Sequence, residues 1–503
     1  MTDYRIFLGN APWRKEGYYG VRAGSRWPHF ESCDEEYMPF PFFLAYATAV
    51  LEENGFECLL VDGIADNLSN DVFIDKAADF KPDLVLLEVS TISINVDLYF
   101  AEKMKEIFGD SAKIALSGLH TAMFEENFLK QYEFVDFILQ GEYEYTLMEL
   151  ANGLSRGENL DKIKGLILRG DNKIIINPRR SVIEDLDALP WPARHHLNLE
   201  NYNDRPGAIP KISAQVWASR GCPFNCVFCA WPQIMYGNNK YRVRDPVDVL
   251  DEIEYLVREF NVKSVYFDDD TFNIGKTRIL KICDEFIKRD LDIPWAIMAR
   301  ADTADEEMLV TMKKAGLYAL KYGVESSSQD ILDRTEKRLD IKKVKKIVKI
   351  TKDIGINIHL TFCLGLPGET KQTLDKTIDL ACELSPDSLQ FSIVTPFPGS
   401  KYFKILDNMG LIVSKNWADY DGYSKAVIKT ENLSSEELEE GLKEAYRRWD
   451  QHILDRIEEA KKLNNRLKRM VHHPIKTPIG FIKRRMAGEH KTKPKTWEEK
   501  HKI

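Results

Sequence analysis

The chain has 503 residues, a formal net charge of −9 and eight cysteines. This length exceeds what one hydrophobic core usually holds, so we expect two or three domains. Three cysteines are clustered and the first residues form no signal peptide, which argues against a disulfide-stapled secreted protein. The longest nearly apolar run, residues 40–51, is too short to cross a bilayer. We therefore expect a cytoplasmic protein.

Residues 1–155 alternate short apolar runs with helical patterns, which predicts βαβ units around a parallel sheet. The apolar runs lie at residues 6–8, 58–61, 84–87, 114–116 and 134–139. Helical patterns at residues 42–53 and 97–108 lie between them. Each run ends in small or polar residues, and open α/β sheets bind ligands beyond the carboxyl ends of their strands. A flavodoxin-like domain is expected, although this fold serves many functions.

Residues 156–212 are expected to connect this domain to the next one. A hairpin is predicted at residues 165–176, where the chain turns at a Gly-Asp-Asn sequence. A loop-like stretch at residues 178–210 follows, and it contains His195 and His196. Paired histidines in such a linker are more often ordinary polar residues than ligands.

A second series of apolar runs and helical patterns occupies residues 213–400. The runs lie at residues 215–218, 264–267, 295–298, 317–324, 356–364 and 389–394. Six such units predict a partial (β/α)6 barrel, whose chemistry lies at the C-terminal ends of the strands. The small or polar residues that follow these strands are Asp268, Asp269, Asp270, Arg300, Glu325, Ser326, Gly365 and Pro367.

Three cysteines directly follow the first strand of this series, in the spacing C-x3-C-x2-C. They are Cys222, Cys226 and Cys229, and neither a fourth cysteine nor a histidine lies close by in the sequence. A structural zinc site usually has four protein ligands, so this pattern does not fit one. Three thiolates instead suit an iron–sulfur cubane with one open iron. The simplest alternative is three buried cysteines without a common role.

The cysteine loop, including Phe228 before its last cysteine, resembles the cluster-binding loop of the radical S-adenosylmethionine (SAM) enzymes. The resemblance implies a [4Fe-4S] cluster on Cys222, Cys226 and Cys229, whose open iron binds SAM. It also implies that SAM is cleaved to a 5′-deoxyadenosyl radical, which abstracts a hydrogen atom from the substrate. The strand-end residues named above lie where this family places its SAM contacts.

Simpler explanations stay open for some of these residues. A solvated acidic turn would explain residues 268–270, and a salt bridge would explain Arg300. Glu369, which follows Pro367, would favour the start of the next helix. The small Gly365 would allow close approach of the backbone to adenine.

Residues 1–155 resemble the B12-binding domain of the cobalamin-dependent radical SAM enzymes. The matching pieces are residues 39–41, 61–63, 117–120 and 140–144. The cobalamin contacts that the resemblance implies are Asp62, Gly63, Ser90, Thr91, Ser117, Gly118, His120, Gln140, Gly141 and Glu142. The motif D-x-H-x-x-G is absent, so His120 is expected to be a loop or packing histidine and not a cobalt ligand. Cobalamin is therefore expected in its base-off form.

The expected fold class is α/β: a flavodoxin-like (Rossmann-type) B12-binding domain, a partial (β/α)6 radical SAM barrel, and a mostly helical C-terminal region, residues 401–503. The expected function is methylation of an unactivated carbon with a [4Fe-4S] cluster, SAM and cobalamin. Alternatives are ring formation or oxidative cyclisation with the same cofactors, and a B12-binding sensor or carrier with a structural cluster. The expected partners are a small-molecule or lipid substrate and an external electron donor of the flavodoxin or ferredoxin type, but no nucleic acid.

The C-terminal region carries a helical pattern at residues 434–464 and a basic tail. From residue 461 onward the chain has 14 Lys and Arg against 3 Asp and Glu, a net charge of +11, so the first 460 residues carry −20. A solvated tail explains this contrast. The alternative is peripheral contact with an anionic membrane. That contact would use Phe481, Ile482, Lys483, Arg484, Arg485 and Met486.

Overall fold

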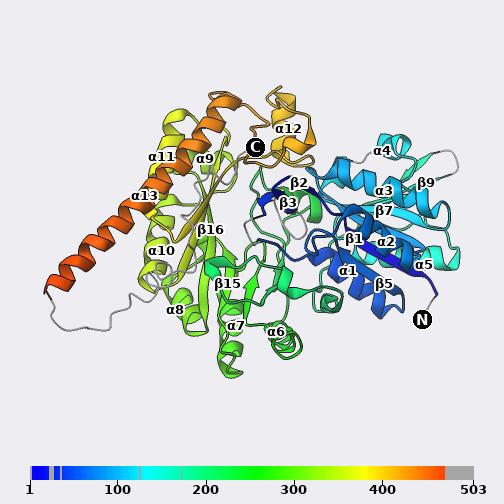
Figure 1. Ribbon diagram of the computed structural model, residues 1–503, viewed down its shortest axis with the longest axis horizontal. Coiled ribbons are helices and arrows are strands. Elements are labelled where there is room, and N and C mark those ends of the chain that lie inside the picture. Colours follow the sequence, from blue (N-terminus) through cyan, green and yellow to red (C-terminus); the bar gives the residue numbers. More distant parts are fainter. Residues whose placement is uncertain (1–2, 22–27, 34–36, 124–125, 171–172, 471–503) are drawn as a thin grey trace.

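The computed structural model describes residues 3–21, 28–33, 37–123, 126–170 and 173–470 (Figure 1). Within these residues, seven strands form the first sheet, in the order β10-β9-β8-β7-β6-β1-β5. The strands are β1 (Arg5–Asn10), β5 (Glu57–Asp62), β6 (Leu84–Val89), β7 (Lys113–Gly118), β8 (Phe137–Leu139), β9 (Leu166–Arg169) and β10 (Ile174–Ile176). The first five in chain order are parallel, as the sequence predicts.

Helices cover both faces of this sheet, which makes it doubly wound. They are α1 (Phe42–Glu53), α2 (Asn70–Phe80), α3 (Ile94–Phe108), α4 (Glu126–Gln131) and α5 (Glu144–Arg156). Alternate residues of β1 point to opposite faces: Ile6 and Leu8 pack with α1 and α5, and Phe7 packs with α2 and α3. A small antiparallel sheet lies between β1 and α1 in the chain, with strands β2 (Arg14–Lys15), β3 (Tyr18–Val21) and β4 (His29–Ser32).

The predicted hairpin exists as β9 and β10, and it extends the first sheet. Strand β9 pairs antiparallel with β8, so the hairpin belongs to the same layer as the parallel strands. The stretch after it runs along α1, where the N–H of Ala193 donates to the carbonyl of Ala45 at 3.0 Å. Its short helical turns are η2 (Arg194–His196), η3 (Leu199–Asn201) and η4 (Pro206–Ala208).

Six strands of the described chain form the second sheet, and all neighbours in it are parallel and in chain order. They are β11 (Ser213–Val216), β14 (Ser264–Phe267), β15 (Trp295–Ala299), β16 (Leu317–Glu325), β17 (Asn357–Leu364) and β18 (Ser388–Ile393). The helices between them are α6 (Pro246–Phe260), α7 (Lys276–Lys288), α8 (Glu306–Lys314), α9 (Gln329–Arg334), α10 (Ile341–Asp353) and α11 (Lys371–Leu384). The sheet begins at β11 and ends at β18, which is the predicted partial barrel.

Short elements surround the cysteine loop. They are β12 (Ser219–Arg220), η5 (Pro232–Tyr236) and β13 (Arg242–Val243) after β11, and η1 (Leu119–Met123) and η6 (Ala301–Thr303) after β7 and β15. Strands β12 and β13 pair with each other in an antiparallel ribbon.

The C-terminal region packs against the last strands of the barrel. It contains α12 (Lys401–Asn408), η7 (Trp417–Asp419) and α13 (Ser435–Met470). Leu438, Leu442 and Ala445 of α13 are buried, and the helix lies along α11 and β18 before it extends beyond the barrel (Figure 1). Within the described residues, no helix is both long and apolar enough to cross a membrane. The basic tail beyond Met470 lies outside the described residues.

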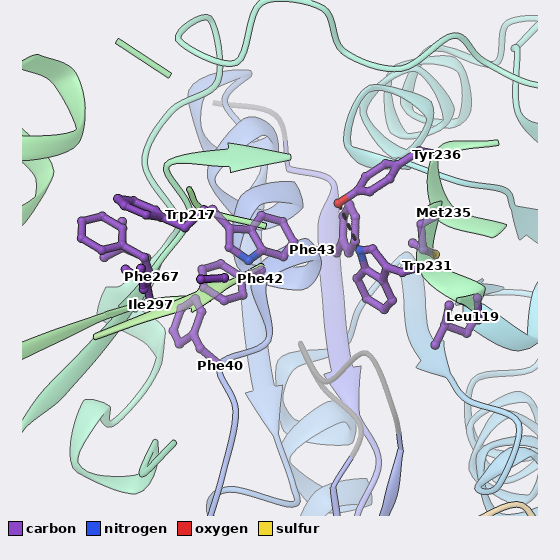
Figure 2. Close-up of a cluster of buried hydrophobic side chains, with 14 of the residues drawn as sticks. Phe40, Phe42, Phe43, Leu119, Trp217, Trp231, Met235, Tyr236, Phe267 and Ile297 are labelled. Carbon is purple, nitrogen blue, oxygen red and sulfur yellow. Dashed lines mark hydrogen bonds between the residues drawn. The ribbon is translucent and has the colours of Figure 1, made fainter. Parts of the chain in front are cut away.

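The two domains share one hydrophobic core. Phe42 of α1 stacks on Trp217, which follows β11, with ring centroids 4.1 Å apart and 11° between the planes. Phe43 also packs against Trp217 and Trp231 (Figure 2). These side chains belong to a single buried cluster that continues to Phe267 inside the barrel. We call this contact the aromatic seam: Phe42, Phe43, Trp217 and Trp231.

Candidate functional site

The three cysteines predicted as cluster ligands lie together in the loop that follows β12. Cys222, Cys226 and Cys229 are free, partly buried thiols. The N–H of Cys229 donates to the carbonyl of Cys226 at 3.1 Å, which keeps the loop tight. Burial raises the pKa of all three thiols, so a bound metal must displace their protons. Three sulfur donors on one loop fit an iron–sulfur cluster.

A side chain that sequence reasoning missed holds this loop together. The amide nitrogen of Gln233 in η5 donates to the carbonyls of Cys226, Val227 and Cys229 at 3.1, 3.1 and 2.6 Å. Its oxygen accepts the N–H of Lys401 at 2.6 Å. Gln233 thus connects the cysteine loop to the start of α12. Its position four residues after the last cysteine was its only signal in the sequence.

The acidic run after β14 binds the backbone that leads into the cysteine loop. Asp269 is fully buried and accepts the N–H of Ala218 at 2.9 Å. Asp270 accepts the N–H of Gly221, also at 2.9 Å. Asp268 is buried as well, so this run is not a solvated turn. Its contact with SAM stays a prediction.

Arg300, at the end of β15, lies directly against the cysteine loop. Its guanidinium is 3.6 Å from the centroid of the Phe224 ring. It donates to both carboxylate oxygens of Asp302 at 2.9 and 2.8 Å, and to the carbonyl of Lys337 at 3.0 Å. The salt bridge considered from the sequence therefore exists, and it places the guanidinium beside the loop.

The end of β16 is irregular at the residues predicted to contact the ribose of SAM. Glu325 has a left-handed backbone, with φ of 67°, next to a shift in the register with β17. Such conformations often occur at functional sites, where the surrounding structure imposes them. Lys337 donates to the Glu325 carboxylate at 2.6 Å. The Ser326 hydroxyl is buried, 3.5 Å from that of Thr377.

The end of β17 turns sharply at Gly365, whose φ is 84°. Its N–H donates to the buried carboxyl of Glu369 at 2.5 Å, and its carbonyl accepts the hydroxyl of Tyr402 at 2.8 Å. Burial raises the pKa of Glu369 to about 8. Thr370, and not Glu369, caps α11. Glu369 therefore supports the turn that contains Pro367, beyond any effect on the helix start.

On the other domain, Asp62 and Gly63 close the end of β5. Asp62 is buried and accepts the N–H groups of Ile64 and Ala65 at 3.2 Å each. It also accepts the hydroxyl of Tyr202 at 3.2 Å, from the segment that connects the domains.

Asn10 ends the neighbouring strand β1, opposite Asp62 in the register. It is fully buried, and neither polar atom of its side chain has a hydrogen-bond partner among the described residues. Leaving a buried polar group unpaired costs roughly 1–3 kcal/mol, so this amide would gain from a hydrogen bond to a ligand bound at the strand end. The sequence showed Asn10 as a strand end but not as a site residue.

The ends of β6 and β7 form the middle of this rim. The Ser90 hydroxyl is 2.7 Å from that of Ser93, which donates to the Asp97 carboxylate at 2.7 Å. The Ser117 hydroxyl donates to the carbonyl of Leu139 at 3.2 Å. These hydroxyls are buried and hold the strand ends in place.

Gly118 and His120 lie next to them. Gly118 has a φ of 112°, and a Cβ there would lie 2.3 Å from the carbonyl oxygen of Val89, so only glycine fits. His120 is buried, 3.2 Å from the Thr91 hydroxyl, and its ring packs edge-on against Trp417 at 5.2 Å. Burial lowers the pKa of His120 to about 4, so its imidazole is neutral at pH 7.

The loop after β8 reaches the other domain. The N–H of Gln140 donates to the carbonyl of Gly165 at 2.9 Å. Gly141 has a φ of 72°, and a Cβ there would lie 2.9 Å from the carbonyl oxygen of Met235, just behind the cysteine loop. Glu142 points away from the rim into a buried ion network.

This network joins the two domains beside the cluster loop. Arg220, two residues before Cys222, donates to Glu142 at 3.2 Å and to Glu144 at 2.6 Å. Arg242 donates to the second oxygen of Glu142 at 2.7 Å. All four charged side chains are buried. We call Glu142, Glu144, Arg220 and Arg242 the Arg220 network.

A small cavity opens between the two domains. It is lined by Phe43, Glu88, Val89, Ser90, Gly118, Leu119, Trp231 and Met235. Ser90, Gly118 and Leu119 come from the strand-end rim of the first domain. Trp231 and Met235 follow the cysteine loop, and Figure 2 shows both of them near Leu119. The strand-end rim of the first domain thus lies next to the segment that follows the cysteine loop.

Comparison with known proteins decides the family. The model of the radical SAM superfamily matches residues 218–381, and that of the B12 binding domain matches residues 36–151. An uncharacterised methyltransferase of Pyrococcus horikoshii is 30% identical over 406 residues, which is 81% of this chain and 86% of that protein. The chain belongs to the cobalamin-dependent radical SAM enzymes.

Other relatives of this radical SAM enzyme catalyse different reactions. An anaerobic magnesium-protoporphyrin IX monomethyl ester cyclase of Rubrivivax gelatinosus is 30% identical over 86% of this chain and 75% of its own length. The cytidylyl-2-hydroxyethylphosphonate methyltransferase of Streptomyces wedmorensis is 25% identical over 80% of this chain and 84% of its own length.

Solved structures of the same fold support the architecture. The methyltransferase TsrM of Kitasatospora setae, with cobalamin and a [4Fe-4S] cluster bound, matches with a TM-score of 0.63 and 16% identity, over 82% of this chain and 76% of its own. OxsB, with aqua-cobalamin and SAM bound, matches with a TM-score of 0.65 and 18% identity, over 82% of this chain and 62% of its own.

The family, the fold class and the three cofactors predicted from the sequence are confirmed. The residues also fit the cofactors: three thiols share one loop, and two glycines and an unpaired amide line the opposite rim. The role of each residue and the domain boundaries stay predictions.

Proposed function

We propose that this enzyme methylates an unactivated carbon of a small-molecule substrate. The observation that carries the proposal is that the segment after the cysteine loop lies against the strand-end rim of the first domain, because a radical and a methyl donor must act on one substrate. When bound, the cluster and SAM supply a hydrogen-abstracting radical, and cobalamin supplies the methyl group. Two relatives that are methyltransferases support this reaction.

The residues at the barrel rim would bind and orient SAM. Cys222, Cys226 and Cys229 would hold the cluster, and Arg300 would pair with the SAM carboxylate. Glu325 would accept a ribose hydroxyl. The acidic run at residues 268–270 would face the amino group, and the turn at residues 365–367 would approach adenine.

The strand-end rim of the first domain would hold cobalamin. The glycines at 118 and 141 leave room for close approach, and Asn10 adds an amide that can pair with a corrin amide. His120 is buried between the Thr91 hydroxyl and the Trp417 ring, and this packing favours the base-off form without a protein imidazole on cobalt.

The test uses SAM with a deuterated methyl group and mass spectrometry of candidate small molecules. The reduced enzyme should cleave SAM and transfer one labelled methyl group to a substrate carbon. The variant Cys226→Ala should lose both activities, whereas Cys382→Ala, a cysteine of α11 far along the chain from the loop, should keep them. SAM cleavage by Cys226→Ala would overturn the cluster assignment.

A second candidate is oxidative ring formation with the same cofactors. The cyclase of Rubrivivax gelatinosus, 30% identical over 86% of this chain, specifically favours it. The same assay separates the two reactions, because cyclisation gives a product that lacks the labelled methyl group and has lost hydrogen.

The cluster also needs an external electron donor, and we propose one of the flavodoxin or ferredoxin type. Reduced flavodoxin should support SAM cleavage by the purified enzyme.

The sequence also raises a lipid substrate, or membrane contact through the basic tail. Co-sedimentation with anionic vesicles at low salt, by the full chain but not by one ending at Leu463, would support the contact.

A further inference from the structure

Glu52, His195 and His196 form a cluster outside the site described above. Glu52 lies in the last turn of α1, and the two histidines end the turn η2. The Nε2 atoms of His195 and His196 lie 3.1 and 2.8 Å from the same oxygen of Glu52. All three possible ligand atoms are within 4.8 Å of one another.

The turn that carries the histidines is anchored before and after them. Arg194 is buried, and its guanidinium donates to the carbonyl of Gln215 at 2.6 Å and to the carboxylate of Glu252 at 3.1 Å. It also lies 4.3 Å from the centroid of the Phe40 ring. Leu197, on the other side of the pair, is buried in the core. The backbone that carries the two histidines is therefore held in place.

The chemistry of the cluster suits a metal ion. In a tetrahedral zinc site with bonds of about 2.0–2.1 Å, ligand atoms lie about 3.3 Å apart. The observed 2.8 and 3.1 Å are close to that spacing. The side chain of His195 is 58% exposed, which leaves a path for the ion.

We propose that Glu52, His195 and His196 bind one divalent transition-metal ion of the Zn²⁺ type, with water at the remaining position. Two imidazoles and a carboxylate are ligands that such an ion prefers. The bound ion would link the segment between the domains, through His195 and His196, to α1 of the cobalamin-binding domain, through Glu52. The sequence alone pointed to ordinary linker histidines, because Glu52 lies 143 residues before His195.

The test uses the full chain with its iron–sulfur cluster assembled, so that the cluster cysteines are occupied. Equilibrium dialysis against Zn²⁺ should show one zinc per chain beyond the iron of the cluster. The variants His195→Ala and Glu52→Gln should each weaken zinc binding at least tenfold. His452→Ala, a histidine of α13 that contacts only the Ser385 hydroxyl in the described hydrogen bonds, should bind zinc like the unchanged protein.

Cobalt(II) gives an independent measurement. The bound ion should show ligand-field absorption without a sulfur-to-cobalt charge-transfer band, because no cysteine belongs to the proposed site. Equal zinc binding by the unchanged protein and His195→Ala would overturn the proposal, as would a cobalt spectrum dominated by the sulfur band. His195 is largely exposed, so its replacement tests the site even where His196→Ala fails to fold.

Discussion

Asn10 is a single buried amide without a hydrogen-bond partner among the described residues, at the rim proposed for cobalamin. Replacing it with leucine, which has a similar volume, removes both unpaired atoms. We therefore expect Asn10→Leu to leave the free energy of unfolding of the apoprotein unchanged or higher. Cobalamin should bind about fivefold less tightly, because one hydrogen bond is worth roughly 1 kcal/mol. Thermal unfolding and titration with hydroxocobalamin measure the two effects.

The matched control is Asn152→Leu. Asn152 lies in α5 of the same domain and donates to the carbonyl of Met148 at 3.1 Å, away from the strand ends. Its replacement should not change the affinity for cobalamin. If Asn10→Leu also binds cobalamin normally, the unpaired amide does not contact this cofactor.

Glu369 predicts a pH effect on stability. Its pKa is raised to about 8 in the folded protein by burial, whereas in the unfolded chain it is about 4.3. The folded state binds this proton more tightly than the unfolded state does. The stabilisation that protonated Glu369 gives the folded state is therefore fully present below about pH 4 and is lost as the pH rises towards 8. Glu369→Gln resembles the protonated form and removes this dependence. Its unfolding temperature should rise relative to the unchanged protein between pH 5 and 8.

The comparison needs only the difference between the two proteins at each pH, because other groups titrate equally in both. The difference should be on the order of 5 kcal/mol at pH 8 and vanish near pH 4. Parallel stability curves for the two proteins would show that Glu369 is ionised when folded.

At the scale of elements, the Arg220 network connects β12 and β13 to the start of α5. Replacing Arg220 by methionine leaves Glu144 buried without its guanidinium, and one oxygen of Glu144 already has no partner among the described residues. We expect a loss of about 3–5 kcal/mol in the free energy of unfolding. The double variant Arg220→Met/Glu144→Leu should be more stable than Arg220→Met alone, because no unpaired charge remains beside the methionine. Urea unfolding of both variants tests this order, and a less stable double variant would contradict it.

Element boundaries could be predicted where the sequence marks both ends. Residues 264–267 match β14, and residues 42–53 match α1, which starts directly after Pro41. The run at 134–139 was too long, because β8 begins only at Phe137. An apolar run shows burial, but pairing with a neighbour decides where a strand starts.

Contacts between distant segments could not be predicted from one sequence. The pairing of the hairpin with β8 depends on strand order in space. Gln233 and Asn10 lacked any motif, and the partners Arg220 and Glu144 are 76 residues apart. The cysteine ligands were visible because their spacing is local, whereas the support around them is tertiary.

At the scale of the whole molecule, the aromatic seam predicts that the two domains unfold together. Calorimetry of the full apoprotein should show one transition, since a single buried cluster spans both domains. Trp217→Ala should lower its midpoint, because removing a buried tryptophan costs about 3–5 kcal/mol. Tyr99→Ala, a change at an exposed aromatic residue of α3, should have little effect. Two well-separated transitions in the unchanged protein would show that the domains are independent.

The aromatic seam also fixes the position of one domain relative to the other. Phe42 and Trp217 stack at 4.1 Å, and the Arg220 guanidinium lies 5.0 Å from the centroid of the Trp217 ring, so the placement of the two domains is set when the chain folds. The domains cannot rotate apart to accept a longer or shorter substrate. We therefore expect the enzyme to select substrates by their length. We expect changes in substrate range to arise from replacement of Trp231 and Met235, because their side chains line the cavity.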